Sequence, residues 1–200
     1  MLSGKSGYSA TVTHGNDRFD DCTLHGEGFI LRAPSASDIG QIAEACQDTL
    51  TQQWLPLPSP YRRSDARWYV EKFAPSQLAT GAGIVRIIDV DDEVAGAIDL
   101  KKTDWRAQTT EIGYWVAPGH RGRGLAGRAS AVLGDWALRE QGMARVEIRA
   151  AVGNVGSSRA AKAAGFDYEG CLRSAGFTHG GRVDLEIYGK TAADADPAVS

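Results

Sequence analysis

The sequence predicts one mixed α/β domain with a mostly antiparallel sheet. Three consecutive strand candidates, residues 83–90, 93–100 and 109–116, are separated by short turns, which is typical of an antiparallel meander. A helix candidate separates the third of these from a further strand, residues 144–151, and a crossover of this length is typical of a right-handed parallel pair. With 200 residues, 42% of them hydrophobic and 24% charged, the chain can bury a core within one domain.

The N-terminal half begins with a segment, residues 1–26, that we expect to be a disordered arm, because its polar, Gly- and Asp-rich sequence has no periodicity. Residues 29–32 (FILR) form a short strand. A serine then caps a helix over residues 38–50, whose apolar side chains recur on one face. The three prolines of segment 54–60 (WLPLPSP) exclude a regular helix or a central strand, and a second helix, residues 64–73, follows.

The segment 111–126 (EIGYWVAPGHRGRGLA) joins the last strand of the meander to the next helix, and it predicts an anion site. The chain breaks at Pro118 and turns through glycines into a helix that begins after Gly124 and ends near Gly142. Amide N–H groups in the first turn of a helix point outward unpaired, and the helix dipole adds partial positive charge there. Glycines also let a phosphate approach the backbone closely. We therefore expect a phosphate-bearing ligand at this loop.

The C-terminal part completes the predicted sheet. After the parallel strand, a short helix begins at Asn154 and ends at a glycine. Residues 167–172 and 182–188 are predicted to form a closing antiparallel pair. The sequence after them is polar, so we expect a folded domain over residues 27–191 and a disordered tail over residues 192–200.

Composition limits the partners and the compartment. A formal net charge of -3 argues against a protein that binds nucleic acid by neutralising phosphates, and no apolar run approaches the length of a membrane span. The three cysteines are odd in number and widely spaced, which fits neither a disulfide framework nor a zinc site. We expect a cytoplasmic protein with reduced thiols and no metal, nucleic-acid or membrane partner.

The glycine turn also satisfies a second pattern. Gly122, Gly124 and Gly127 match G-x-G-x-x-G, and Glu147 follows 20 residues beyond the last glycine, so a dinucleotide-binding enzyme is an alternative. Three observations count against it: the first glycine is too far from the preceding strand, the loop is cationic, and only two further strands follow Glu147.

The loop 121–126 (RGRGLA) matches the R/Q-x-x-G-x-G/A loop of the GNAT acyl-CoA N-acyltransferases. On this motif the chain resembles that family. The run 111–170 is similar to the RimJ/RimL branch, the ribosomal-protein N-terminal acetyltransferases, in its EIGYWVAP, NxxS, AGF and EG motifs. The resemblance covers residues 28–190. It implies a GNAT-type sheet with a V-shaped splay between its fourth and fifth strands and helices on both faces. It also implies direct transfer of an acyl group from acetyl-CoA, or another acyl-CoA, to a primary amine within a ternary complex.

The resemblance assigns the cofactor to the loop and the splay. Loop amides would hold the CoA pyrophosphate, which agrees with the anion site, and the strand edge would pair with the pantetheine arm. The implied cofactor-binding residues are Trp115, Val116, Arg121, Gly122, Arg123, Gly124, Leu125, Ala126, Asn154 and Ser157.

Acyl transfer requires a deprotonated amine, a stabilised carbonyl oxygen and a leaving thiolate. Many GNAT members place a tyrosine seven residues after the asparagine to assist the thiolate, but Ala161 stands there in this chain. The RimJ/RimL branch implies a serine instead, and Ser157 matches it; its alternative role is helix capping. The branch implies a glutamate base at the position of Gly176. Glu111 is therefore the leading candidate base, with a structural carboxylate as its alternative role, and Asp99 is the second candidate.

The acceptor stays open between a protein N-terminus, a lysine and a small-molecule amine. Because the tyrosine of many GNAT members and the glutamate of this branch are both missing, a catalytically silent acyl-CoA sensor is a further alternative. Dimers are common in this branch, so a homodimer is expected. The candidate substrate residues are Trp54, Tyr61, Asp99, Trp105 and Phe177.

Overall fold

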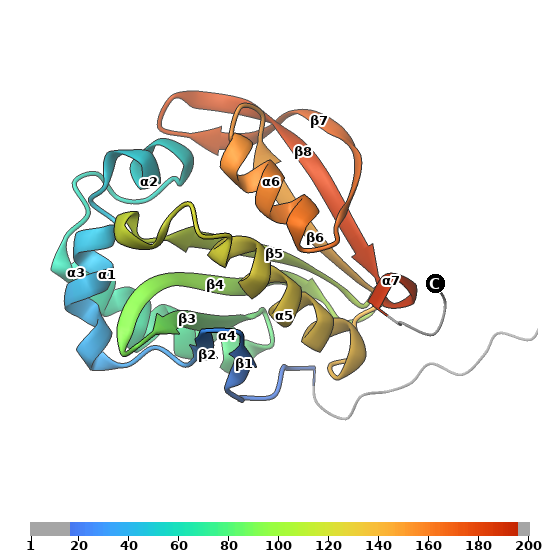
Figure 1. Cartoon of the computed structure of the whole chain (residues 1–200), viewed down its shortest axis with the longest axis horizontal. Helices are drawn as coiled ribbons and strands as arrows, with labels where there is room; N and C mark the ends of the chain where they lie inside the picture. Colours follow the sequence, from blue (N-terminus) through green and yellow to red (C-terminus); the bar gives the residue numbers. More distant parts are fainter. Residues whose placement is uncertain (1–16, 196–200) are drawn as a thin grey trace, which may run out of the picture.

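The computed structural model describes residues 17–195, which form a single eight-stranded sheet in the order β1-β2-β3-β4-β5-β6-β8-β7 (Figure 1). The strands are β1 (Leu24–Gly26), β2 (Phe29–Arg32), β3 (Ile84–Val90), β4 (Glu93–Asp104), β5 (Thr109–Val116), β6 (Arg145–Ala151), β7 (Asp167–Thr178) and β8 (Gly181–Thr191). The helices are η1 (Ala36–Asp38), α1 (Ile39–Ala45), α2 (Thr49–Trp54), α3 (Arg63–Trp68), η2 (Tyr69–Phe73), α4 (Ala74–Thr80), η3 (Pro118–His120), α5 (Leu125–Arg139), α6 (Val155–Ala163) and α7 (Ala192–Ala195).

The sheet is antiparallel except where β5 meets β6, so the predicted meander and the predicted parallel unit are both confirmed. The parallel pairing runs from Thr109, opposite Arg145, to Ile112, opposite Ile148, and stops there. Residues 113–116 of β5 continue to pair with β4 on their other side. The two strands therefore diverge after Ile112, which confirms the V-shaped splay.

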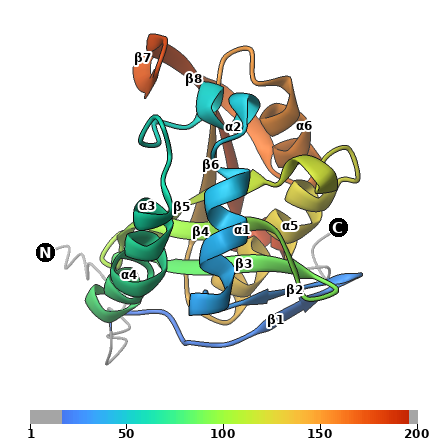
Figure 2. The same cartoon turned by 90° about the vertical axis from the view of Figure 1, so that its left-hand side faces the viewer.

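Helices cover both faces of the sheet, as expected (Figures 1 and 2). Helix α5 packs on one face, where its side chains Leu133 and Trp136 join a large apolar cluster with strand residues such as Ile98 and Ile112. On the other face, helices α1 and α3 pack against Ile87 and neighbouring side chains in a second cluster. Because both faces are buried, the central strand β3 is apolar almost throughout, apart from Arg86 and Asp89.

The prediction of a disordered arm is wrong for residues 17–26. The side chain of Phe19 is only 2% exposed and packs against Trp105 and Trp136 at ring-centroid distances of 4.8 and 5.9 Å. Strand β1 then pairs with β2. A single aromatic anchor without periodicity carries no pattern that sequence analysis can detect. The remainder of the predicted arm, residues 1–16, lies outside the described residues.

Several predicted boundaries also shift. The expected helix over 38–50 ends at Cys46, and α2 begins separately because the Asp48 side chain caps it by accepting a hydrogen bond from the Thr51 amide. The second helix continues beyond residue 73, since Pro75 lies in the first turn of α4, where a missing amide hydrogen costs little. Strands β4, β7 and β8 are longer than expected. Residues 192–195 of the expected tail form α7, and the tail's last five residues lie outside the described part of the chain.

Candidate active site

A cavity of ≈ 580 Å³ fills the splay between β5 and β6. Its walls come from the two strands and from α2, α5 and α6, with one residue each from β4 (Lys101) and η3 (His120). Of the predicted cofactor-binding residues, Arg123 alone does not line the cavity. Those that line it are Trp115, Val116, Arg121, Gly122, Gly124, Leu125, Ala126, Asn154 and Ser157.

The loop that lines the cavity has a backbone conformation that requires glycine at two positions. Gly122 has φ +76° and Gly124, the N-cap of α5, has φ +70°, in the left-handed region that other residues adopt at a cost. A Cβ atom at either position would have no neighbour within 4 Å, so the backbone conformation, not crowding, selects glycine. The first turn of α5 carries no acidic side chain. Gly124, Leu125 and Ala126 line the cavity, so the anion site that the sequence predicts would lie at this end of it.

Gly127, the third glycine of the G-x-G-x-x-G pattern, has a packing role. A Cβ atom there would lie 3.2 Å from the Ala160 carbonyl oxygen and 3.2 Å from the Ala163 Cβ. The residue thus permits close contact between α5 and α6. The spacing that suggested a dinucleotide site is explained by helix packing.

The Arg121 side chain turns away from the anion site toward α2. Its Nε donates to the Val116 carbonyl at 3.0 Å, and its Nη2 donates to Asp48 at 2.6 Å and to Thr51 Oγ1 at 2.7 Å. The guanidinium lowers the pKa of Asp48 through this hydrogen bond. Arg121 therefore fastens α2 to the loop, and the backbone amides of the loop are left to bind an anion.

Across the splay, Asn154 and Ser157 occupy the start of α6. Asn154 Oδ1 accepts a hydrogen bond from the Ser157 amide at 3.1 Å, so the capping role of Asn154 is present. Ser157 Oγ lies 2.9 Å from the phenolic oxygen of Tyr114, a residue of β5 that sequence analysis did not select. Tyr114 also lines the cavity. Because side chains alternate along a strand, Tyr114 lies on the face that α5 covers and Trp115 on the opposite face. That alternation is visible in the sequence, but no spacing connects Tyr114 with Ser157.

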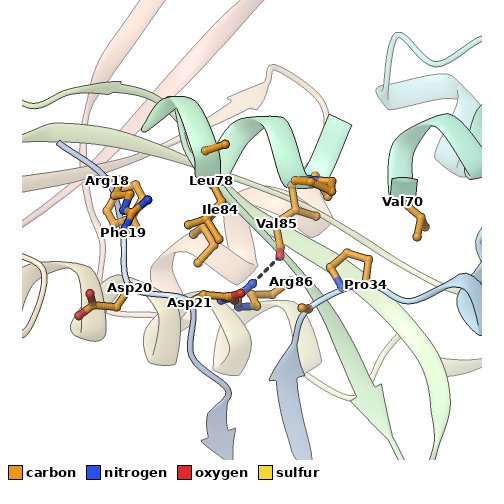
Figure 3. Close-up of a pocket in the computed structure, with 14 residues that line it drawn as sticks. Arg18, Phe19, Asp20, Asp21, Pro34, Val70, Leu78, Ile84, Val85 and Arg86 are labelled. Atoms are coloured by element: carbon orange, nitrogen blue, oxygen red, sulfur yellow. Dashed lines mark hydrogen bonds and ion pairs between the residues drawn. The ribbon is translucent and has the colours of Figure 1, made fainter. Parts of the chain in front are cut away.

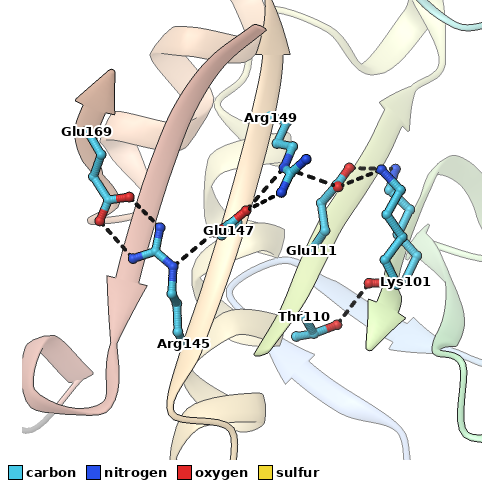
Figure 4. A network of polar contacts seen from close by, with 8 residues as sticks. Lys101, Thr110, Glu111, Arg145, Glu147, Arg149 and Glu169 are labelled. Carbon is cyan, nitrogen blue, oxygen red and sulfur yellow. Dashed lines mark hydrogen bonds and ion pairs between the residues drawn. The ribbon is translucent and has the colours of Figure 1, made fainter. Parts of the chain in front are cut away.

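Glu111 lies in an ion-pair network that joins β4, β5 and β6 (Figure 4), and two of its partners, Lys101 and Arg149, line the cavity. The buried carboxylate is 2.9 Å from Lys102 Nζ, 3.5 Å from Lys101 Nζ and 3.5 Å from Arg149 Nε. The network continues through Glu147, which pairs with Arg149 at 2.9 Å. Three cations thus share the Glu111 carboxylate, which supports the structural role that the sequence left open.

Asp99 lies beside the point where β5 leaves β6. Its carboxylate accepts a hydrogen bond from the Gly113 amide at 3.1 Å, and Gly113 lines the cavity. Burial raises the pKa of Asp99 to about 6, against the opposing effects of Lys101 and the Gly113 amide. Asp99 itself does not line the cavity. A carboxylate that titrates near neutrality directly behind the cavity wall is nevertheless a candidate to accept a proton from a bound amine.

Residues 29–167 match the family model described as an acetyltransferase (GNAT) domain. The chain belongs to this family. The ribosomal-protein-serine acetyltransferase of Escherichia coli (strain K12) is 31% identical over 50% of this chain and 56% of its own length. YdaF of Bacillus subtilis (strain 168), named as a candidate ribosomal N-acetyltransferase, is 34% identical over 62% of this chain and 70% of its own length.

A solved structure of RimL, named as a ribosomal L7/L12 alpha-N-protein acetyltransferase in complex with coenzyme A, has the same fold. It superimposes with a TM-score of 0.78 at 23% identity and covers 87% of this chain and 99% of its own. The resemblance to the RimJ/RimL branch is confirmed, and the dinucleotide and sensor alternatives are not favoured.

In this GNAT domain, the structure brings only some of the candidate substrate residues to the cavity. Trp54 lines it from the end of α2. Tyr61 is buried in the apolar cluster beneath α1, and Trp105 packs on Phe19 and donates to the Gly81 carbonyl at 2.8 Å. Phe177 is 64% exposed on β7. None of these three lines the cavity in the splay.

A second cavity, of ≈ 500 Å³, lies between the segment before β1, helix α4 and strand β3 (Figure 3). Its buried Arg86 pairs with Asp21 at 2.7 Å and donates to the Val85 carbonyl at 3.1 Å. No predicted site residue lines it.

Within residues 17–195, no group of three or more His, Cys, Asp and Glu side chains is arranged to hold a metal ion. None of the helices in this range is long and apolar enough to cross a membrane.

Proposed function

We propose that this chain is an N-acetyltransferase that transfers the acetyl group of acetyl-CoA directly to a primary amine in a ternary complex. The observation that carries the proposal is the splay of β5 from β6, with a helix N-terminus at its mouth. It offers an anion site at one end, an unpaired strand edge along its length and polar side chains where the strands part. A CoA thioester presents matching groups in the same order: a pyrophosphate, an amide-bearing arm and a reactive carbonyl.

The CoA would be held mainly by backbone. The amides of residues 121–126 would bind the pyrophosphate, and the free edge of β5 at Trp115 and Val116 would pair with the pantetheine amides as a neighbouring strand does. The Asn154 side-chain oxygen is engaged in capping, which leaves its amide nitrogen to donate to the pantetheine. The cap and the ligand contact are thus compatible.

For the chemistry, we propose that Ser157 hydrogen-bonds to the leaving sulfur and that Asp99 accepts the proton of the amine. Glu111 was the leading candidate base from sequence, and it stays a candidate. Its ion pairs with Lys101, Lys102 and Arg149 favour Asp99, because they already engage both oxygens of the Glu111 carboxylate. Asp99 has no such pair within the described chain and adjoins the Gly113 wall of the cavity.

The acceptor is proposed to be a protein N-terminus, a lysine or a small amine. The names of the relatives make an N-terminus the first to test. Gly176, where the branch implies a glutamate, is packed under Leu185, with 2.6 Å between its would-be Cβ and Leu185 Cδ2. A side chain at this position would require Leu185 to move, so we expect the acceptor to be bound by other residues, Trp54 among them.

A cytoplasmic homodimer completes the proposal. The edge strand β7 exposes three large hydrophobic side chains, Tyr168 at 53%, Leu172 at 46% and Phe177 at 64%, which a second copy could cover. Light scattering coupled to gel filtration tests the dimer, and a monomer at working concentration would refute it.

The activity is tested by release of the CoA thiol from acetyl-CoA in the presence of a panel of N-terminal peptides, lysine peptides and small amines. Thermal unfolding with CoA, acetyl-CoA, succinyl-CoA and NADH measures cofactor choice. We expect amine-dependent release and stabilisation by the CoA compounds alone. Tight CoA binding with no release for any amine would favour the sensor, and stabilisation by NADH alone would favour the dinucleotide enzyme.

A further inference from the structure

We infer that Tyr114 is a positioning residue for Ser157: its phenol donates a hydrogen bond to Ser157 Oγ and so directs the serine's own proton toward the leaving sulfur. The inference rests on the proposed acetyl transfer and on the geometry of the two walls of the splay. Tyr114 comes from β5 and Ser157 from α6, so the pair spans the cavity from one wall to the other.

The contact is close and specific. The Tyr114 phenolic oxygen lies 2.9 Å from Ser157 Oγ and 3.1 Å from the Ser157 backbone carbonyl. Among the hydrogen bonds of residues 17–195, no other group reaches Ser157 Oγ. Tyr114 itself packs against the apolar cluster under α5, and burial raises the pKa of its phenol above the ordinary value. The phenol therefore keeps its proton at neutral pH and acts as a donor.

A serine hydroxyl has one proton and can both donate and accept. If Ser157 donated to Tyr114, its only proton would be held by the phenolic oxygen and could not be donated to the sulfur. If Tyr114 donates, Ser157 accepts through a lone pair, and its proton is free to point at the sulfur. The phenol could instead donate to the Ser157 carbonyl, and the inference is that it donates to Oγ.

The transfer step balances without a proton from Tyr114. The neutral amine nitrogen forms a bond to the thioester carbon, and the carbonyl π pair moves to oxygen. When that pair returns, the C–S bond breaks and sulfur keeps both bonding electrons. The nitrogen gives its extra proton to the base. The thiolate, stabilised by the Ser157 hydrogen bond, leaves and takes a proton from water, while Tyr114 and Ser157 keep theirs.

The test is a double-mutant cycle on the single-turnover rate of acetyl transfer at saturating acetyl-CoA. We expect Tyr114→Phe to lower this rate about fivefold to tenfold, the size of one hydrogen bond, with CoA affinity unchanged. In a Ser157→Ala background the same change should cost less than about twofold, because the group that Tyr114 positions is gone. Tyr188→Phe is the matched control: it also removes a buried phenol, one that donates to Glu186 at 2.8 Å, and should leave the rate unchanged.

An unchanged rate in Tyr114→Phe would overturn the inference, and so would an equal loss with and without Ser157, since both indicate a packing role. Melting temperatures establish that each variant is folded. If Tyr114→Phe does not fold, 3-fluorotyrosine at position 114 replaces it. Its more acidic phenol is a stronger donor and should raise the rate in the presence of Ser157 only, and an equal rate would again refute the inference. Absence of acetyl transfer by the wild-type chain with every amine would refute the proposed function instead.

Discussion

Replacing Asp99 with asparagine removes a titrating carboxylate and keeps the shape of the side chain. The amide oxygen of asparagine can still accept the 3.1 Å hydrogen bond from the Gly113 amide, and the side-chain volume barely changes. What is lost is the negative charge and the ability to take a proton. Two measurements respond to that loss: the pH dependence of unfolding and the pH dependence of the rate.

The magnitude follows from the pKa of the folded state. Asp99 titrates at about 6 when folded and at the ordinary value of 3.8 when unfolded. The folded chain therefore keeps this proton up to a higher pH than the unfolded chain does, and the free energy of unfolding falls as pH rises from about 4 to about 6. A difference of about two pKa units corresponds to about 3 kcal/mol, as an order of magnitude. Asp99→Asn should match the wild type in stability below about pH 4 and exceed it by up to ~3 kcal/mol above about pH 6.

Urea unfolding of both proteins at a series of pH values measures this difference directly. The rate should move in the opposite sense: wild-type turnover falls as pH drops through about 6, where Asp99 becomes protonated. The asparagine variant should lose about a hundredfold or more in rate and show no inflection there. The acceptor amine for this assay should titrate outside this pH range, so that its own protonation does not change the measured rate. Stability curves that stay parallel, or a low-pH limb that survives in Asp99→Asn, would refute the assignment.

Three other changes test the remaining parts of the site. Gly124→Ala should weaken CoA binding about 5- to 30-fold, because a left-handed φ costs about 1–2 kcal/mol outside glycine, whereas Gly119→Ala, with no positive φ, should leave calorimetric affinity unchanged. Glu111→Gln should destabilise the fold, yet keep the low-pH limb of the rate and move its midpoint downward, since the Glu111 charge raises the pKa of Asp99. Arg121→Met should lower the free energy of unfolding by about 2 kcal/mol through its lost charge-assisted hydrogen bonds, and a smaller change than about 0.5 kcal/mol would contradict its fastening role.

The parts of the fold that sequence analysis predicted correctly are those that short-range rules determine. Strand β5 was placed to the residue because alternating and β-branched side chains end at Pro118. The start of α5 followed from Gly124, and the start of α6 from Asn154, because each residue acts on its own turn of backbone. The splay itself required the resemblance to known acyltransferases, since nothing local forces β5 and β6 apart after Ile112.

The parts that were missed depend on long-range contacts. Phe19 is buried because it packs against Trp105, in the turn after β4, and Trp136 of α5, and no residue close to Phe19 in the sequence indicates that contact. The same limit applies at the site. Tyr114 and Ser157 are 43 positions apart and meet only because one strand and one helix form the two walls of a cavity. Side-chain partners across a cavity cannot be inferred from periodicity, which describes one element at a time.

Arg121 illustrates both the short-range rules and the long-range contacts. Its place in the loop is a motif feature, but its side chain makes long-range contacts with Asp48 and Thr51 of α2. Helix α2 ends in Trp54, whose ring lies 3.7 Å from the would-be Cβ of Gly153 on the far side of the splay. The loop that would hold the CoA pyrophosphate is therefore joined to the wall that would meet the amine. Ordering of the loop by CoA would also order that wall, which is what direct transfer within a ternary complex requires.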